Sequence, residues 1–145
     1  LPFDVRLRPG ESPYRQIVYA ATKAVVSGDL LPGAPFPSVR VLSQALKVNP
    51  NTAHKVIAEL VRSDILEVLP GVGTVVAEWG PASAEERRQL LSEDVERLLV
   101  EAKRLHLSLQ DVQEGVAERW AELFDELRLT TGDENRSSST VKEAG

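Results

Sequence analysis

The chain has 145 residues, of which 42% are hydrophobic and none is cysteine, and its formal net charge is −5. Such a chain can fold as one domain, or as a small domain with an appendage, but it cannot form disulfides or thiolate metal sites. Its only two histidines, His54 and His106, are too far apart in sequence to suggest a shared metal ion.

Two further exclusions concern the membrane and secretion. No apolar run approaches the roughly 20 residues that span a bilayer. The sequence around Leu1 does not resemble a signal peptide. We therefore expect a cytoplasmic protein without a membrane segment.

The charge is divided unevenly along the chain. Residues 1–79 hold eight Lys/Arg and seven Asp/Glu, a net of +1, whereas residues 80–145 hold nine and fifteen, a net of −6. This asymmetry suggests two parts with different roles. A net of +1 is low for a single nucleic-acid-binding module, so two copies acting together would strengthen such binding.

The first two predicted elements are a strand and a helix. Residues 3–8 alternate apolar and polar side chains, which predicts a short strand that ends at Pro9–Gly10. Ser12 and Pro13 then form a helix start, and the helix is expected to run to about residue 27, before Gly28. Its inward stripe makes it part of the core and consists of Tyr14, Ile17, Val18, Ala21 and Val25.

Residues 38–60 predict two short helices with a tight break at 47–49. Pro32–Gly33 upstream suits a type II turn, and Ser38 is a plausible cap for the first of the two helices. In the second helix Asn49 can be the N-cap and Pro50 the first helical residue. The apolar stripe of that helix is Ala53, Val56, Ile57, Leu60 and Val61.

A β-hairpin is predicted next. Residues 65–69 and 74–77 are β-branched runs on either side of Pro70–Gly73, which is the pattern of strand, glycine turn and strand. Three helices followed by a hairpin form a winged helix-turn-helix, so the predicted fold class is mainly α with a small β-wing. The strands can be purely structural, and only the tip from Gly71 to Gly73 is a candidate for contact with a phosphate.

The outer face of the second short helix suggests DNA recognition. It carries amide, hydroxyl and cationic side chains and no carboxylate before Glu59. Asn can pair with adenine, Thr can meet a thymine methyl group, and Lys or His can reach guanine or phosphate. A solvated face that only keeps a surface helix soluble is the alternative. The residues of this face are Asn51, Thr52, His54, Lys55, Ala58 and Arg62.

Four segments together give a specific resemblance. They are PYRQI at 13–17, SGDLLPGAPFPSVR at 27–40, VNPNTAHKVIAELVRSDILEV at 48–68 and GVGTVV at 71–76. In these segments the chain resembles the amino-terminal domain of GntR-family bacterial transcription regulators, over roughly residues 3–77. The short remainder resembles the YtrA-type branch, in which the carboxy-terminal part is only a helical dimerisation hairpin.

The resemblance implies a set of DNA-binding residues: Arg40, Asn49, Asn51, Thr52, His54, Lys55 and Gly71. Arg40 would touch the DNA backbone or base edges, and Gly71 would lie at the tip of the wing. Two positions depart from the family pattern. The wing tip around Pro70 and Val72 carries no cation, and His54 stands where a stronger cation is frequent, so its contact would be weaker or dependent on pH.

The acidic half predicts two further helices, at about 84–106 and 109–128. Each opens with a capping box, which begins at Ser83 in the first helix and at Ser108 in the second. His106 near the end of the first helix is explained by the helix dipole. Residues 130–145 lack periodicity and are predicted to be disordered, in a tail from 129 to 145.

Both of these helices carry an apolar stripe, which predicts a dimer. A two-helix hairpin cannot bury two such stripes by itself, but pairing with a second copy would form a four-helix bundle. Folding of the hairpin onto the winged domain, in a monomer, is the alternative. Trp120 and Phe124 could line a ligand pocket, but aromatic residues on such a stripe more often serve in packing. The predicted dimerisation residues are Leu91, Val95, Leu98, Ala102, Leu105, Val112, Val116, Trp120 and Leu123.

The sequence therefore predicts a winged helix-turn-helix domain at 3–78 and a dimerisation hairpin at 83–128. The expected function is a homodimeric, sequence-specific transcription regulator, more readily a repressor, on a pseudo-palindromic operator in double-stranded DNA. The rival is a winged-helix protein-interaction module. No paired carboxylates, activated nucleophile or phosphate loop indicate an enzyme, no cofactor is expected, and an unidentified small-molecule effector remains open.

Overall fold

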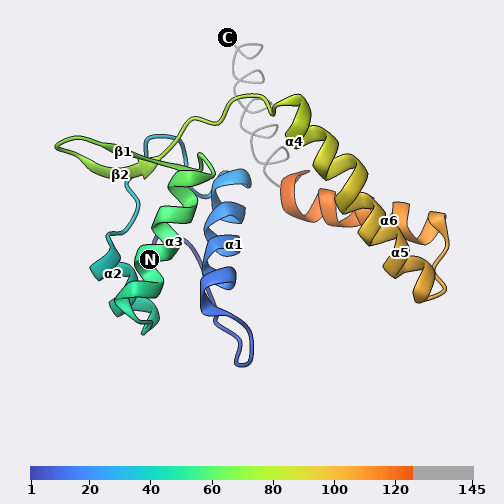
Figure 1. Cartoon of the computed structure of the whole chain (residues 1–145), viewed down its shortest axis with the longest axis horizontal. Helices are drawn as coiled ribbons and strands as arrows, with labels where there is room; N and C mark the ends of the chain where they lie inside the picture. The colour runs from blue at the N-terminus through green and yellow to red at the C-terminus, as the bar shows by residue number, and fades with distance from the viewer. Residues whose placement is uncertain (126–145) are drawn as a thin grey trace, which may run out of the picture. The chain divides into compact units, whose positions relative to one another are not determined.

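The computed structural model describes residues 1–125 and divides the chain into two units, the first from Leu1 to Trp79 and the second from Gly80 onward. Figure 1 shows the elements of each unit. The first unit is helical with one antiparallel two-stranded sheet, and the described part of the second is helical. The predicted fold class is confirmed. The predicted tail, 129–145, lies outside the described residues.

The winged unit begins its helices where the sequence predicts. The Ser12 hydroxyl accepts a hydrogen bond from the Arg15 amide, and the Ser38 hydroxyl accepts one from the Val41 amide. Each cap satisfies a backbone donor that has no partner inside its helix. The elements are α1 (Pro13–Val26), α2 (Val39–Leu46), α3 (Pro50–Arg62), β1 (Leu66–Leu69) and β2 (Gly73–Val76).

The core of this unit is assembled around α3. This helix packs against α1, α2 and β1, and Figure 1 shows α1 and α3 side by side. Ala53, Val56 and Leu60 on α3 are fully buried together with Ile17 of α1 and Leu42 of α2. Because the inward stripe of α3 is buried in the core, the opposite face of this helix points outward in a fixed orientation.

The wing is a short hairpin in a defined register. Leu66 is opposite Val76 and Leu69 is opposite Gly73, so Pro70, Gly71 and Val72 form the loop. The Val72 amide donates to the Leu69 carbonyl over 3.1 Å. Gly71 has a φ of +77°, the left-handed conformation that the third residue of a type II turn requires.

The predicted strand at 3–8 is wrong, because this segment has no strand partner. Pro35 forms an isolated bridge with Val75 beside the hairpin. At the end of the segment the backbone amide and carbonyl of Arg8 are bonded by the side chain of Gln16, at 2.7 and 3.1 Å. Phe3 is buried and stacks on Phe36 at a ring distance of 5.5 Å. The alternating pattern therefore reflects packing on the core without a β-ladder.

The described part of the second unit consists of two helical arms. The elements are α4 (Ala84–Arg88), the π-helical segment η1 (Gln89–Asp94), α5 (Val95–Arg104), α6 (Leu109–Trp120) and the π-helical segment η2 (Ala121–Asp125). Both predicted capping boxes are present, with Ser83 and Glu86 in the first and Ser108 and Asp111 in the second. The predicted end of the second helix, at 128, lies outside the described residues.

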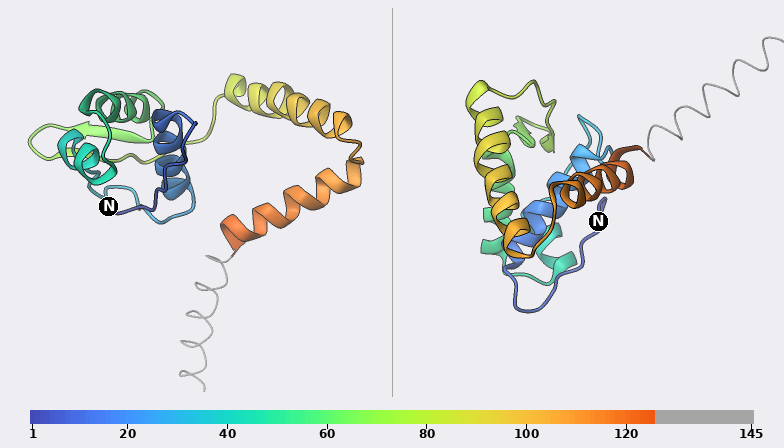
Figure 2. Two further views of the ribbon diagram at one scale, coloured as in Figure 1. Left: turned by 90° about the horizontal axis from the view of Figure 1, so that it is seen from below. Right: turned by 90° about the vertical axis from the view of Figure 1, so that its right-hand side faces the viewer.

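The turn between the arms is fixed by its backbone. His106 adopts a left-handed conformation with a φ of 61°. The Leu107 amide donates to the Ala102 carbonyl, and the His106 amide donates to the Lys103 carbonyl. This is the Schellman arrangement that ends many helices. The two views of Figure 2 show α5 and α6 diverging from this turn.

Candidate nucleic-acid interface

The outer face of α3 is free to meet a ligand. Asn51, His54 and Lys55 are exposed, and Thr52 is half-buried at the edge of the face. Among residues 1–125, no hydrogen bond or ion pair engages the side chains of these four residues. Their donors and acceptors are therefore available to base edges or phosphates.

Asn49 has a structural task in addition to its predicted one. Its Oδ1 atom accepts the amide hydrogen of Asn51 at 2.8 Å, so this oxygen caps α3. The NH₂ group of this side chain remains free to donate to DNA. The structure therefore assigns Asn49 first to the start of the helix.

Two arginines at this surface differ in their partners. Arg40 near the start of α2 is exposed and has no ion pair within the described residues. Arg62 at the end of α3 binds Glu59 through Nε at 2.8 Å and through Nη2 at 2.5 Å. These hydrogen bonds lower the pKa of the Glu59 carboxyl and raise the pKa of Arg62. Arg62 is therefore already engaged, whereas Arg40 is available.

The wing tip offers backbone and apolar surface. Gly71 is exposed, and a Cβ atom there would meet nothing within 4 Å, so the positive φ is what favours glycine. Val68 and Val72 expose 62% and 72% of their surface. The sequence of the loop supplies no cation that could enter a minor groove. Contact through Gly71 stays a prediction.

Most of the predicted dimerisation residues are exposed, whereas Val95, Val112 and Leu123 are half-buried and Ala102 is buried. Ala102 is 6% exposed, so it offers little surface to a partner. The two arms enclose an apolar hollow of about 550 Å³. Its lining includes five predicted residues together with Leu99 and Leu109. The predicted residues in it are Val95, Leu98, Val112, Val116 and Trp120.

Sequence periodicity missed part of this surface. Inside the helix the Val95 amide donates to the Leu90 carbonyl, the i to i−5 bond of a π-helix. This turn carries one extra residue, so it interrupts the regular heptad spacing that assigns Leu91 to the stripe. Leu99 could have been found, since it lies four residues after Val95. The π-turn itself could not have been found, because nothing in the sequence pattern marks it.

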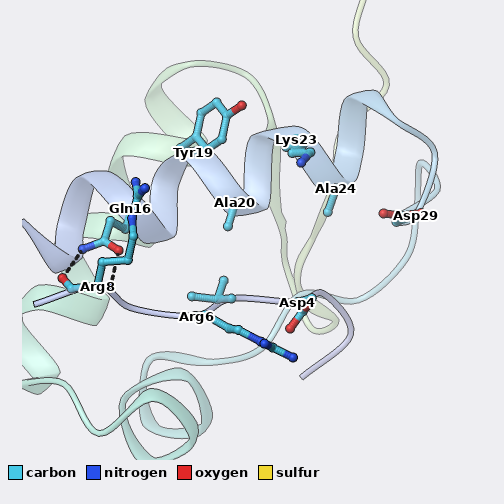
Figure 3. A pocket seen from close by; sticks show the side chains of 10 residues that line it. Asp4, Arg6, Arg8, Gln16, Tyr19, Ala20, Lys23, Ala24 and Asp29 are labelled. Carbon is cyan, nitrogen blue, oxygen red and sulfur yellow. Dashed lines mark hydrogen bonds between the residues drawn. The ribbon is translucent and has the colours of Figure 1, made fainter. Parts of the chain in front are cut away.

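Figure 3 shows a second hollow, of about 310 Å³, between residues 4–8 and α1. Arg6 and Lys23 line it together with Asp4 and Asp29, so both signs of charge are present. Gln16 is occupied by the backbone carbonyls of Arg8 and Glu11. This mixture does not define one class of ligand, and a small-molecule effector stays a prediction.

The fold and the free face of α3 define the class: a winged helix-turn-helix whose third helix presents amides and cations outward. Among residues 1–125, no helix combines the length and the apolar character needed to cross a membrane.

Comparison with known proteins agrees with this class. The model of the bacterial regulatory proteins of the gntR family matches residues 13–76. The chain is 33% identical to the uncharacterized HTH-type transcriptional regulator YhcF of Bacillus subtilis (strain 168), over 78% of this chain and 93% of that protein. It is 31% identical to the HTH-type transcriptional repressor YtrA of the same organism, over 72% of this chain and 82% of that protein.

A solved structure shows the same fold. The transcriptional antiterminator of Listeria monocytogenes EGD-e superposes with a TM-score of 0.73 at 23% identity, over 83% of this chain and 91% of that one. The chain belongs to the GntR family of bacterial regulatory proteins, and the similarity to YtrA confirms the YtrA-type resemblance. These relatives are transcription regulators and not enzymes, as the sequence predicts.

Proposed function

We propose that the protein is a cytoplasmic, homodimeric repressor that binds a pseudo-palindromic operator in double-stranded DNA. Each protomer inserts α3 into a major groove. Arg40 and the Asn49 end of α3 position the helix on phosphates, while Asn51, Thr52, His54 and Lys55 meet base edges or phosphates. The backbone at Gly71 is the candidate contact of the wing.

One observation supports this proposal most strongly. Val56 and Leu60 on the inner side of α3 are fully buried, while Asn51 and Lys55 on its outer side are exposed. A helix fixed in this way presents a rigid polar face, and side chains on rigid elements recognise DNA with little loss of conformational freedom. Within residues 1–125 the side chains of Asn51, His54 and Lys55 also have no internal partners that would have to be broken.

The dimer is supported by the apolar surface of the hairpin. Leu98, Val116 and Trp120 are exposed on the described helices, and contiguous apolar surface of this kind marks interaction sites. A second copy would cover it in a four-helix bundle. Two-fold symmetry also doubles the phosphate contacts of a unit whose own net charge is only +1.

The repressor role is proposed from the similarity to YtrA, which is named a repressor. Its test is a reporter gene placed behind the DNA upstream of this protein's own gene. Expression of the protein should lower the reporter signal. A signal that rises would instead indicate an activator.

The DNA-binding assignment is tested with a duplex that the wild-type protein selects from a random-sequence pool. In the triple variant Arg40→Ala, Asn51→Ala, Thr52→Ala, affinity for this duplex should fall by several orders of magnitude, with unchanged thermal melting. The single change Asn51→Ala should relax base preference at one position per half-site, by roughly 1–3 kcal/mol. Undiminished affinity in the triple variant would contradict the assignment of these residues, and a wild-type protein that selects no duplex would favour a protein-interaction module.

A further inference from the structure

Lys47 stands out by its backbone conformation. Three non-glycine residues within 1–125 have a positive φ: Lys47 at 54°, Asp64 at 60° and His106 at 61°. Aspartate and histidine are enriched in this left-handed conformation, whereas lysine is not. Glycine would adopt it without the steric cost of a Cβ atom. The lysine side chain at this turn is therefore costly to the fold.

The turn holds Lys47 rigidly beside the start of α3. Lys47 is the C-cap residue of α2, and its amide donates to the Ser43 carbonyl. The Val48 amide donates to the same carbonyl at 3.1 Å. Asn49, the N-cap of α3, follows two residues after Lys47. The side chain of Lys47 thus leaves the backbone next to the helix that carries the polar face.

The electrostatic surroundings of Lys47 favour an anion. No carboxylate occurs between Asp29 and Glu59 in the sequence. Lys47 is exposed and forms no ion pair within the described residues. Arg8 and Arg62 of the same unit, by contrast, are each bound to a neighbouring glutamate.

We propose that Lys47 binds a DNA phosphate beside each half-site and so acts as a positioning contact that is distinct from base reading. This inference rests on the proposed function, because it needs α3 to lie in a major groove. A lysine is a flexible point charge that suits a phosphate oxygen. The contact would add to those of Arg40 and Lys55.

The experiment compares variants of the full-length protein on the duplex selected by the wild type, with binding measured at several salt concentrations. Lys47→Gly removes the charge and the steric cost together, whereas Lys47→Gln removes the charge and keeps the cost. Both should make the slope of log K against log salt shallower by about 1.8 for a dimer, since each phosphate contact contributes about 0.9. Only Lys47→Gly should also raise the melting temperature. Base preference should stay unchanged in both.

Two matched controls separate charge and backbone effects. Lys23→Gln removes the same charge from an exposed lysine of α1 and should leave the slope unchanged. Asp64→Gly places glycine at the other left-handed turn of this unit and should not make the slope shallower. A wild-type slope in both Lys47 variants, or an equal loss in Lys23→Gln, would overturn the inference and leave the proposed function intact. A wild-type protein without salt-dependent binding would overturn both.

Discussion

In the winged unit Leu42 and Leu60 have no exposed surface, whereas in the helical unit Leu98 and Trp120 are 48% and 61% exposed. Both units contain amphipathic helices with clear caps. They differ in what covers the apolar stripe, since the winged unit covers its own and the described part of the hairpin does not. An apolar stripe in the sequence therefore predicts that a helix face is buried, but it does not identify the surface against which that face packs.

The largest expected effect comes from placing a charge on the open stripe. Leu98→Glu should dissociate the proposed dimer, because two buried leucines contribute roughly 3–6 kcal/mol, at about 1.5–3 kcal/mol each. Sedimentation equilibrium measures the change.

Val100→Glu is the matched control for this variant. Val100 is also exposed on α5 but does not line the hollow between the arms. The control should remain dimeric. Equal dissociation of the two variants, or of neither, would contradict the assignment of the stripe.

The next prediction compares the loss of stability from a buried leucine of the winged unit with that from an exposed leucine of the hairpin. Leu60→Ala should lower the free energy of unfolding by about 2–5 kcal/mol, because the fully buried side chain leaves a cavity. This loss should be the same at low and at high protein concentration. The loss from Leu98→Ala should instead shrink on dilution, since the stability that dimerisation adds by mass action falls with the protein concentration in both proteins. Urea unfolding at two concentrations distinguishes these behaviours.

The smallest effect concerns pH and the turn of the hairpin. Hydrogen bonds from Ser108, first from its backbone amide, lower the pKa of the Asp111 carboxyl. A lowered pKa in the folded state means that the ionised carboxylate stabilises the fold above its unfolded pKa of about 3.9. That contribution is lost as the pH falls through the lowered value.

Asp111→Asn should therefore reduce the loss of helix stability on acidification, as measured by circular dichroism melting. Glu118→Gln, which removes an exposed acid of the same helix without a capping role, should leave the acid profile as it is. An acid profile that is identical in Asp111→Asn and the wild type would contradict the account of this cap.

Local signals predicted the elements of this molecule well. Caps at Ser12, Ser38 and Asn49 lie where hydroxyl or amide side chains precede a helix, because such a cap depends only on neighbouring residues. The strand at 3–8 failed, because a strand needs a partner that the segment's own sequence does not specify. The π-turn before Val95 was not predicted either, since no residue type in the sequence indicates its hydrogen-bond pattern.

The face of α3 that forms the candidate site could be predicted from the sequence, but the state of individual side chains on and beside it could not. The outward positions of α3 follow from helical periodicity, so Asn51 and Lys55 were found on the exposed face. The engagement of Arg62 by Glu59 and the left-handed turn at Lys47 depend on atomic geometry. Those two facts decide which cations remain for DNA.

The most direct test is a footprint of the wild-type protein on its selected duplex, using chemical probes of major-groove purine atoms and of the sugar backbone. We predict two protected clusters related by two-fold symmetry, with centres one helical turn, about 10 base pairs, apart or a multiple of it. In Asn51→Ala one base contact per cluster should disappear while the backbone protection remains. A single cluster, protection confined to the minor groove, or a pattern unaltered by Asn51→Ala would contradict the account.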